Sequence, residues 1–458
     1  MSGRQAAPKG RPWEGRHLHL IGVGGAGMSG YARAAHALGA TVGGSDATDS
    51  DGLRRLQSDG ILSVAHVGHS AENLPSPQDG PFELYYSSAI AESNPERVAA
   101  RERGIEEHPR ADLLAQLSAM RRTIAVAGTH GKTTTCSMLV EALSGAGLNP
   151  GWLIGAPAGG ERPNAHWSEG EWLVVEADES DGSMLSLDVE IAVLTNVELD
   201  HHARFASLTE LREDFHRFLA AAKKAVIWDR PELLALRHDG DGDGTTAYAT
   251  PEASLKDGGS SFSWRGHEVT LSVPGIHNAT NATGALEAAR LAGADPPRAA
   301  AALAHFTGAG RRFQLLGHGP GGAAIYEDYA HHPTEIAATL AGARTLSHRR
   351  LVAVFQPHLF SRTRLLAREF GHALAQADIA MVLDVYPARE RAEDHPGVSG
   401  LTIAETTADA SSGKPVYWLP RFADATHVLG SILRADDVCV VMGAGDVDRL
   451  AHGLVVAK

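Results

Sequence analysis

The sequence has few cysteines and no long apolar run. Its 458 residues include only two cysteines, Cys136 and Cys439, and neither begins a metal-ligand spacing. This scarcity excludes a disulfide framework and fits a reducing compartment. No stretch approaches the roughly 18 apolar residues of a membrane span, and no apolar core precedes Leu18. We therefore expect a soluble, cytoplasmic protein without membrane insertion.

An excess of positive charge is also lacking. The chain has 41 Lys and Arg against 55 Asp and Glu, a formal charge of −14. This balance argues against a surface that neutralises a nucleic-acid backbone or an anionic membrane, so no nucleic-acid partner is expected. An anionic ligand must instead be bound by a local site.

What the sequence does contain is a repeated alternation of short β-branched runs and longer helical patterns. This alternation predicts α/β domains with mostly parallel sheets, and at about 150 residues per domain the length predicts about three of them. We place the three blocks at residues 1–118, 119–313 and 314–458. Strands are predicted at 17–21, 41–42, 84–86, 123–127, 172–175, 191–195, 324–326, 351–355, 379–385 and 438–441, with a hairpin at 261–273 and a helix at 278–292.

A glycine-rich segment, GTHGKTTT at 128–135, follows the strand predicted at 123–127 and opens a helix. Glycines let backbone N–H groups turn toward an anion, and Lys132 supplies a charge for β- and γ-phosphates. Thr133 can ligate Mg²⁺. Because Val126 replaces the first glycine of the strict pattern, the segment is a shorter variant of the phosphate-binding loop. The alternative is a helix start with an accidental Gly-Lys-Thr.

Two acidic clusters, EADESD at 176–181 and ELDHH at 198–202, follow the next two predicted strands. The carboxyl ends of parallel strands share one edge of a sheet, so both clusters should meet the phosphate-binding loop there. Carboxylates beside a triphosphate need intervening cations, which indicates Mg²⁺ coordination. Each cluster taken alone also fits a helix N-cap.

The first block carries GVGGAG at 22–27, which matches G-x-G-x-x-G, and Asp46 lies about 20 residues further on. Alone, this pattern is typical of NAD binding and leaves an NAD-dependent oxidoreductase open. Any diphosphate can bind at such a helix start, however. Ser87 and Ser88 offer hydroxyls after another predicted strand.

Polar residues follow two predicted strands of the third block as well. His331 and His332 follow one, and His358, Arg362 and Arg364 follow the other. Zinc is disfavoured because adjacent His side chains diverge and no third ligand has a recognisable spacing. Helix-start packing and a substrate or phosphate contact both remain open for the His pair.

In their order along the chain, these motifs resemble the Mur ligases of bacterial cell-wall synthesis. The matching stretches are GVGGAGMSG (22–30), GSD (44–46), SSAI (87–90), GTHGKTTT (128–135), EADESDGS (176–183), TNVELDHH (195–202), PGIHNATNA (274–282), GAGRRF (308–313), EDYAHHPTE (327–335), FQPHLFSRTR (355–364), DVYPARE (384–390) and MGAGD (442–446). An oxidoreductase would leave the phosphate-binding loop unexplained, and a nucleotide switch would leave the third block unexplained.

The resemblance implies a Rossmann-like domain at 1–118 that binds the UDP part of a sugar nucleotide. It implies a P-loop ATPase-type domain at 119–313 and a Rossmann-like domain at 314–458 that closes over ATP and the amino acid. The implied reaction joins L-alanine to the lactyl carboxylate of UDP-N-acetylmuramate through an acyl phosphate, in peptidoglycan precursor synthesis, with ATP and Mg²⁺. A monomer or weak homodimer is expected.

The resemblance also assigns roles to individual positions. Catalytic roles fall on Lys132, Glu176, His201, His332 and Arg362, and Mg²⁺ ligation on Thr133, Glu176 and His201. ATP contacts fall on Gly128, Thr129, His130, Gly131, Lys132, Thr133, Thr134, Asn278, Asn281, Arg311, Arg312 and Asp328. Substrate contacts fall on Gly24, Gly25, Ala26, Gly27, Met28, Ser29, Ser45, Asp46, Ser87, Ser88, His331 and His358.

Two positions depart from the family pattern. Leu359 stands where many relatives have Arg, which removes a phosphate or carboxylate contact and leaves Arg362 and Arg364 as candidates. Ala203 stands where many have Asp, which removes a partner of the metal site. The nearest relative to exclude is a ligase that attaches a whole tripeptide, whose glycine loop usually departs from the GGAGMS found at 24–29. Selectivity among L-alanine, glycine and L-serine is left open, as is the group that takes the amine proton.

Overall fold

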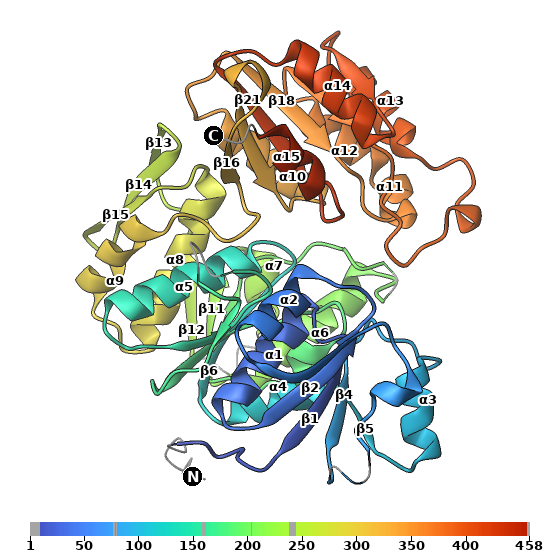
Figure 1. Ribbon diagram of the computed structural model, residues 1–458. Helices are drawn as coiled ribbons and strands as arrows, with labels where there is room; N and C mark the ends of the chain where they lie inside the picture. Colours follow the sequence, from blue (N-terminus) through green and yellow to red (C-terminus); the bar gives the residue numbers. More distant parts are fainter. Residues whose placement is uncertain are drawn as a thin grey trace. The chain divides into compact units, whose positions relative to one another are not determined.

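The computed structural model describes residues 10–76, 78, 80–157, 162–202, 204–237 and 244–455. The chain divides into two compact units, one of Met1–Ala249 with Asn281–Leu303 and one of Thr250–Thr280 with Ala304–Lys458. Both units combine helices with sheets whose strands are mostly parallel (Figure 1). The predicted α/β class is therefore confirmed. Ala203, one of the two departures from the family pattern, lies outside the described residues.

The first sheet of the first unit is five-stranded and parallel, in the order β3-β2-β1-β4-β5. Its strands are β1 (His17–Ile21), β2 (Thr41–Asp46), β3 (Leu62–Val67), β4 (Glu83–Tyr86) and β5 (Glu107–Pro109). Its helices are α1 (Ala26–Ala37), α2 (Asp51–Ser58), α3 (Pro95–Glu102) and α4 (Arg110–Ala119). Because β1 lies in the middle, the loop after it opens at the centre of the sheet's carboxyl edge.

The central sheet of the first unit has seven strands in the order β12-β11-β10-β6-β9-β7-β8, all parallel except β8. They are β6 (Arg122–Ala127), β7 (Gly151–Leu153), β8 (Ala165–His166), β9 (Trp172–Glu176), β10 (Ile191–Leu194), β11 (Lys224–Trp228) and β12 (Thr245–Tyr248). The helices are α5 (Lys132–Gly145), α6 (Leu208–Ala221), α7 (Pro231–Leu234) and α9 (Pro296–Ala302). Since β6 lies between β9 and β10, the two acidic clusters flank the loop after β6, as predicted.

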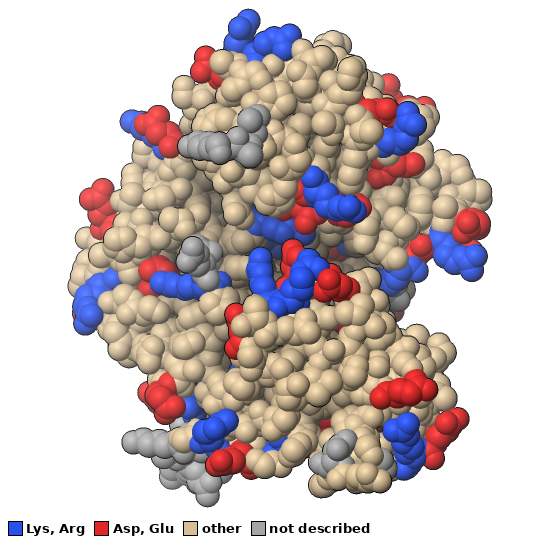
Figure 2. All heavy atoms as spheres, viewed as in Figure 1, with Lys and Arg blue, Asp and Glu red and all other residues tan. Residues whose placement is uncertain are grey.

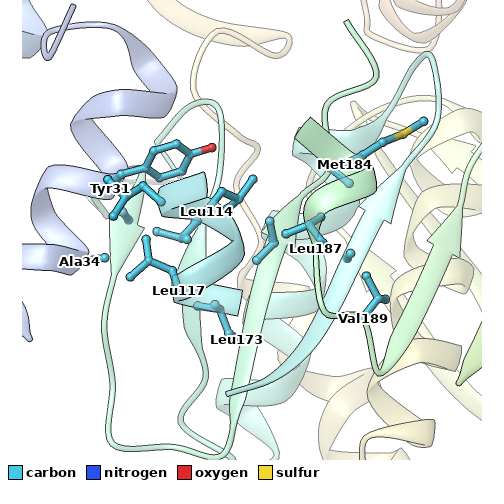
Figure 3. Packing of buried hydrophobic residues seen from close by; sticks show 14 of the residues in the cluster. Tyr31, Ala34, Leu114, Leu117, Leu173, Met184, Leu187 and Val189 are labelled. Atoms are coloured by element: carbon cyan, nitrogen blue, oxygen red, sulfur yellow. The ribbon is translucent and has the colours of Figure 1, made fainter. Parts of the chain in front are cut away.

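One hydrophobic core joins the two sheets of the first unit. In Figure 3, side chains of α1 and α4 lie with side chains of the central sheet and of the segment after β9, namely Tyr31, Ala34, Leu114, Leu117, Leu173, Met184, Leu187 and Val189. All eight are buried members of one cluster. This shared packing fixes the loops of the first sheet relative to those of the central sheet.

The second unit is built on a six-stranded sheet in the order β16-β17-β21-β18-β19-β20, in which only β16 is antiparallel. Its strands are β16 (Gln314–His318), β17 (Ala324–Asp328), β18 (Arg350–Phe355), β19 (Ile379–Val382), β20 (Val416–Trp418) and β21 (Asp437–Met442). Its helices are α10 (Pro333–Ala343), α11 (Phe360–Leu365), α12 (Ala367–Leu374), α13 (Gly400–Ala410), α14 (Phe422–Ile432) and α15 (Asp448–Leu454).

Both faces of this sheet are covered. Leu351 and Ala353 of β18 pack in one cluster with residues of α10, α12 and α13, whereas Val352 and Val354 pack in a second cluster with residues of α14 and α15. Strands buried on both faces are apolar at every position, which explains why β18 and β21 were predictable as continuous apolar runs.

A small antiparallel sheet of β13 (Ala253–Lys256), β14 (Gly259–Trp264) and β15 (His267–Leu271) also belongs to the second unit. Its β14–β15 hairpin confirms the predicted one, with Arg265 and Gly266 at positive φ in the turn. The predicted helix at 278–292 is α8 (Ile276–Leu291).

The strand predicted at 379–385 is wrong in length. Strand β19 ends at Val382, because the Asp384 carboxylate accepts hydrogen bonds from the backbone N–H groups of Val385 and Gly400, both at 2.9 Å. The chain therefore turns toward α13 and does not continue the ladder.

Among the described residues, no helix combines the length and apolar character needed to span a bilayer. On the face drawn in Figure 2, Lys and Arg side chains lie beside Asp and Glu side chains. This mixture is in keeping with the acidic overall composition.

Candidate active site

The loop between β6 and α5, residues 128–131, forms the centre of the candidate site, and we call it the phosphate loop. Gly128 has a φ of +133°, and a Cβ atom there would lie 2.1 Å from Thr195 Oγ1. Gly131, with a φ of +81°, is the N-cap of α5. These positions need glycine. The loop thus lies before a helix N-terminus, which favours anions.

Residues that follow β10 hold the phosphate loop in place. Thr195 Oγ1 donates to the His130 carbonyl at 2.7 Å, and the His130 N–H donates to Asn196 Oδ1 at 2.8 Å. Thr129 Oγ1 donates to the Glu198 carbonyl at 3.0 Å and accepts from the Glu198 N–H at 2.9 Å. The end of β10 therefore meets the phosphate loop, as predicted from the strand pattern.

Lys132 is a partly buried lysine whose ammonium group binds other groups of the protein. Its Nζ donates to both carboxylate oxygens of Glu179, at 3.0 and 2.8 Å, and to the Gly128 carbonyl at 2.7 Å. Glu179 is completely buried, and its Oε1 also lies 3.3 Å from His201 Nε2. Burial lowers the pKa of Lys132, but the charges of Glu179 and Asp178 outweigh it, so the net shift is upward. Lys132 is therefore fully charged at neutral pH.

Glu176, at the end of β9, contacts the first turn of α5. Thr133 Oγ1 donates to Glu176 Oε1 at 2.9 Å, and the Gly155 N–H donates to Glu176 Oε2 at 2.7 Å. The neighbouring Thr134 is buried. A hydroxyl and a carboxylate at this distance are hard oxygen donors, so the pair fits a Mg²⁺ ion. The imidazole of His201 lies beside Glu179, a residue to which sequence reasoning gave no role.

Asn278 and Asn281, the two asparagines among the predicted ATP contacts, lie on α8. The side chain of Asn281 packs on the phosphate loop, since a Cβ atom on Gly131 would lie 2.9 Å from Asn281 Oδ1. Asn278 Nδ2 donates to the Pro274 carbonyl at 2.7 Å, which fixes the first turn of the helix.

The glycine-rich segment of the first sheet, residues 22–27, is held from several sides, and we call it the glycine loop. The Gly24 N–H donates to Asp46 Oδ2 at 2.9 Å, and a Cβ atom on Gly24 would lie 2.4 Å from Ser50 Oγ. Asn164 of the central domain donates to the Ala26 carbonyl at 2.7 Å. Asp46 thus binds the loop itself, and Gly25 is the N-cap of α1.

The other predicted substrate residues of the first block have mixed surroundings. Met28 is part of the core, and Ser29 Oγ donates to the Ala26 carbonyl at 3.1 Å. Ser45 is buried with its Oγ 3.1 Å from His69 Nδ1. Ser87 Oγ accepts from the Ala89 N–H at 3.4 Å, and Ser88 is exposed. Their proposed ligand contacts remain predictions.

In the second unit, Asp328 is buried at the end of β17. Its Oδ1 accepts from the Ala330 N–H at 2.7 Å and its Oδ2 from the Phe313 N–H at 2.9 Å. Burial raises the pKa of Asp328 to about 6, although the charge of Arg312 opposes the shift. Arg311 Nε donates to Glu327 Oε1. Asp328 and Arg311 therefore tie the chain before β16 to the end of β17.

The polar residues after β17 and β18 come together in the second unit. The His358 ring lies 6.1 Å from the His331 ring and is stacked on Tyr386 at 5.8 Å, and Arg362 Nη1 lies 3.3 Å from His358 Nδ1. His332 is the N-cap of α10, in a capping box with Glu335. The helix-start role left open for His332 is therefore present. Leu359 has a φ of +71°, an unusual conformation for a leucine.

Three family models match the chain in order. They are the Mur ligase family catalytic domain at residues 17–122, the Mur ligase middle domain at 126–289 and the Mur ligase glutamate ligase domain at 311–445. The chain therefore belongs to the Mur ligase family. Members of this family are ATP-dependent ligases, so the resemblance is confirmed and the oxidoreductase alternative falls.

Comparison with curated relatives indicates which members of the family the chain resembles. The chain is 41% identical to the UDP-N-acetylmuramate–L-alanine ligase of Mycobacterium sp. (strain JLS), over 97% of this chain and 96% of the relative. It is also 41% identical to the ligase of that name from Mycobacterium avium (strain 104), with the same coverage. Among solved structures, it is similar to the UDP-N-acetylmuramate-alanine ligase of Thermotoga maritima, with a TM-score of 0.80, 26% identity and coverage of 96% and 98%.

A murein peptide ligase from Psychrobacter arcticus has a similar structure as well, with a TM-score of 0.69 and 25% identity, and covers 97% of this chain and 100% of its own. The fold is thus shared by ligases that attach different groups. The 41% identity to relatives of one name, compared with 25% to the murein peptide ligase, distinguishes the two classes better than the fold does.

Proposed function

We propose that this chain joins L-alanine to the lactyl carboxylate of UDP-N-acetylmuramate in peptidoglycan precursor synthesis, with hydrolysis of ATP to ADP and phosphate. The full-length identity to ligases of that activity carries the proposal. The phosphate loop, with Lys132 and the Thr133–Glu176 pair beside it, supports it chemically. It supplies what phosphoryl transfer needs, a positioned cation and hard oxygen ligands.

The chemistry proceeds in two steps. A lactyl carboxylate oxygen attacks the γ-phosphorus of ATP, the bond to the β-phosphate oxygen breaks, and an acyl phosphate and ADP form. The neutral α-amine of L-alanine then attacks the acyl carbon, the C–O bond to phosphate breaks, and the amide forms as the amine loses a proton. Lys132 stabilises the charge on the transferring group. No residue is assigned as the acceptor of that proton.

Thr133, Glu176 and His201 are the proposed ligands of Mg²⁺. When bound, the ion offsets the charge of the β- and γ-phosphates and of the incoming carboxylate. The chain's own part is to orient these ligands: Gly155 holds one oxygen of Glu176 through its N–H, and Glu179 lies against the imidazole of His201.

The remaining assignments follow the family pattern. Residues 1–118 bind the UDP part of the sugar nucleotide, 119–313 bind ATP, and 314–458 close over ATP and the amino acid. Asn278, Asn281, Arg311, Arg312 and Asp328 are proposed on the ATP side. His331, His332, His358 and Arg362 are proposed beside the amino acid and the reacting groups. A cytoplasmic monomer or weak homodimer is proposed, which sedimentation at several concentrations would test.

The decisive experiment measures phosphate release from ATP and Mg²⁺ with UDP-N-acetylmuramate and one acceptor at a time. L-alanine, glycine, L-serine and a murein tripeptide are the acceptors, and mass spectrometry identifies the product. We expect the amide product with L-alanine at the highest kcat/KM. Product with the tripeptide and none with any single amino acid would replace the proposal with murein peptide ligation.

A further inference from the structure

Arg110, the first residue of α4, connects the glycine loop to the central domain. Its Nε donates to Asp181 Oδ2 at 2.5 Å and its Nη2 to Asp178 Oδ2 at 3.1 Å. Its Nη1 lies against the glycine loop, since a Cβ atom on Gly27 would be 2.6 Å away. Only 13% of the side chain is exposed. No motif in the sequence singles this arginine out.

Two carboxylates surround this one guanidinium. Asp178 and Asp181 both accept hydrogen bonds from Arg110. Burial raises the pKa of Asp181, but its hydrogen bond to Arg110 outweighs that effect, so the net shift is downward. With its charge already matched by two anions, Arg110 is not a spare cation for an incoming diphosphate.

Both aspartates belong to residues 177–183, which we call the acidic loop. The Oδ1 atom of each aspartate accepts a hydrogen bond from within the loop. The Ser180 N–H donates to Asp178 Oδ1 at 2.9 Å, and the Ser183 N–H donates to Asp181 Oδ1 at 3.0 Å. The Oδ2 atom of each aspartate accepts a hydrogen bond from Arg110. The guanidinium thereby holds the acidic loop at two points.

Between the two aspartates, Glu179 faces the other way. Its carboxylate binds Lys132 Nζ at 2.8 and 3.0 Å and lies 3.3 Å from His201 Nε2. The acidic loop thus contacts Arg110 through its two aspartates and Lys132, the first residue of α5, through Glu179. Arg110 and the acidic loop thus connect the glycine loop to Lys132.

We propose that Arg110 is a positioning residue for phosphoryl transfer: by holding the acidic loop, it sets the place of Glu179 and through it that of Lys132. The part that concerns turnover rests on the proposed function. Arg110 acts through the loop and touches no reacting atom. Its loss should therefore impair the phosphate side of the site and spare sugar-nucleotide binding.

The test compares Arg110→Ala and Arg110→Lys with the full-length wild type. A matched control is Arg101→Ala, which removes an exposed arginine that pairs with Glu107 in the same domain. We expect Arg110→Ala to lower kcat tenfold or more, with the KM for UDP-N-acetylmuramate within threefold of wild type. Arg110→Lys should recover part of kcat, since an ammonium keeps the charge but not the two-point geometry. Arg101→Ala should match wild type.

A double-mutant cycle tests whether Arg110 acts through Asp181. Asp181→Asn keeps the oxygen that accepts from Ser183 and loses the charge toward Arg110. If the two residues act as one clamp, Arg110→Ala/Asp181→Asn should be no slower than Arg110→Ala alone. Independent, multiplying effects on kcat would overturn the clamp.

Binding measurements separate this inference from the proposed function. Calorimetry with the non-hydrolysable β,γ-imido analogue of ATP should show at least threefold weaker binding to Arg110→Ala, whether or not amide product forms. Absence of product with wild type would refute the function alone. Unchanged analogue affinity, or a tenfold loss of UDP-N-acetylmuramate affinity with analogue binding intact, would refute the positioning role.

Discussion

The ammonium group of Lys132 donates hydrogen bonds to the buried Glu179 carboxylate and to backbone carbonyls. A buried charge pair of this kind is sensitive to the loss of either member, because the remaining charge stays buried. To bind a phosphate group, Lys132 must replace its hydrogen bonds to the Glu179 carboxylate with hydrogen bonds to phosphate oxygens. Its role in chemistry and its role in stability are therefore linked through one partner.

We expect Lys132→Ala to lower kcat by roughly 10² or more, since a preorganised positive donor at the transferring phosphoryl group is lost. It should also lower the melting temperature, because the buried Glu179 carboxylate loses both hydrogen bonds from Lys132 Nζ. The double variant Lys132→Ala/Glu179→Gln should regain stability but not turnover. Near-normal turnover of either variant, measured by phosphate release, would remove Lys132 from the mechanism.

Asp328 gives a prediction for pH. Its pKa is raised to about 6, so the native state binds this proton more tightly than the unfolded chain does. Its contribution to stability is therefore greatest below about pH 4 and is lost as the pH rises toward 6. Relative to wild type, Asp328→Asn should gain on the order of 2–3 kcal/mol between pH 4 and pH 7, at about 1.4 kcal/mol per pKa unit. Calorimetry at both values measures this, and an equal difference at both would show that Asp328 does not titrate in that range.

At the residue scale, sequence patterns predict local chemistry and miss distant pairs. Lys132 and Thr133 were predicted from the glycine-rich segment at 128–135, and Glu176 from a polar strand end. The structure brings Thr133 and Glu176 together. Arg110 is not predictable in this way, because its partner Asp181 is 71 residues away and only the packing of two sheets makes them neighbours.

Among the elements, the turn from β6 into α5 has little room for a larger residue. At Gly128 a side chain would meet Thr195 Oγ1 and the Asn196 backbone, and the φ of +133° is strained for any other residue. The phosphate loop depends on this position for its shape.

We therefore expect Gly128→Ala to weaken binding of the ATP analogue tenfold or more. The matched control is Gly430→Ala in α14, where a Cβ atom would meet nothing within 4 Å. This substitution should stabilise the protein by about 0.5–1 kcal/mol through helix propensity and leave nucleotide binding unchanged. Calorimetric titration and thermal unfolding report both effects. Normal affinity in Gly128→Ala would show that the phosphate loop adapts to the added methyl group.

Element prediction succeeded where burial leaves a strong pattern. The strands β6, β10, β18 and β21 each contain a run of at least four apolar residues, because a strand that is buried on both faces needs apolar side chains on both. Short edge strands such as β5, β8 and β20 were missed, since two or three residues carry no period. The end of β19 was missed because one side chain, Asp384, turns the chain.

At the scale of the whole molecule, the chain forms two compact units. The largest cluster of the first unit joins α1 and α4 to the central sheet, and the two clusters of the second unit lie on opposite faces of the β16–β21 sheet. The discontinuous course of the chain, with 250–280 in the second unit and 281–303 in the first, has no signature in composition. The hydrophobic pattern of a sequence does not show whether a segment stays in the unit that precedes it or joins the other unit.

The division into two compact units predicts separate unfolding. We expect calorimetry to show two transitions, and UDP-N-acetylmuramate to raise only the one that belongs to the first unit, since the glycine loop lies there. A ligand at about 100 times its Kd stabilises the state it binds by about 2.7 kcal/mol, which is about 5 °C or more for a unit of this size. Asp328→Asn, a change confined to the second unit, serves to assign the transitions, because it should move the other one. A single transition that both the ligand and the substitution shift would mean that the two units unfold as one.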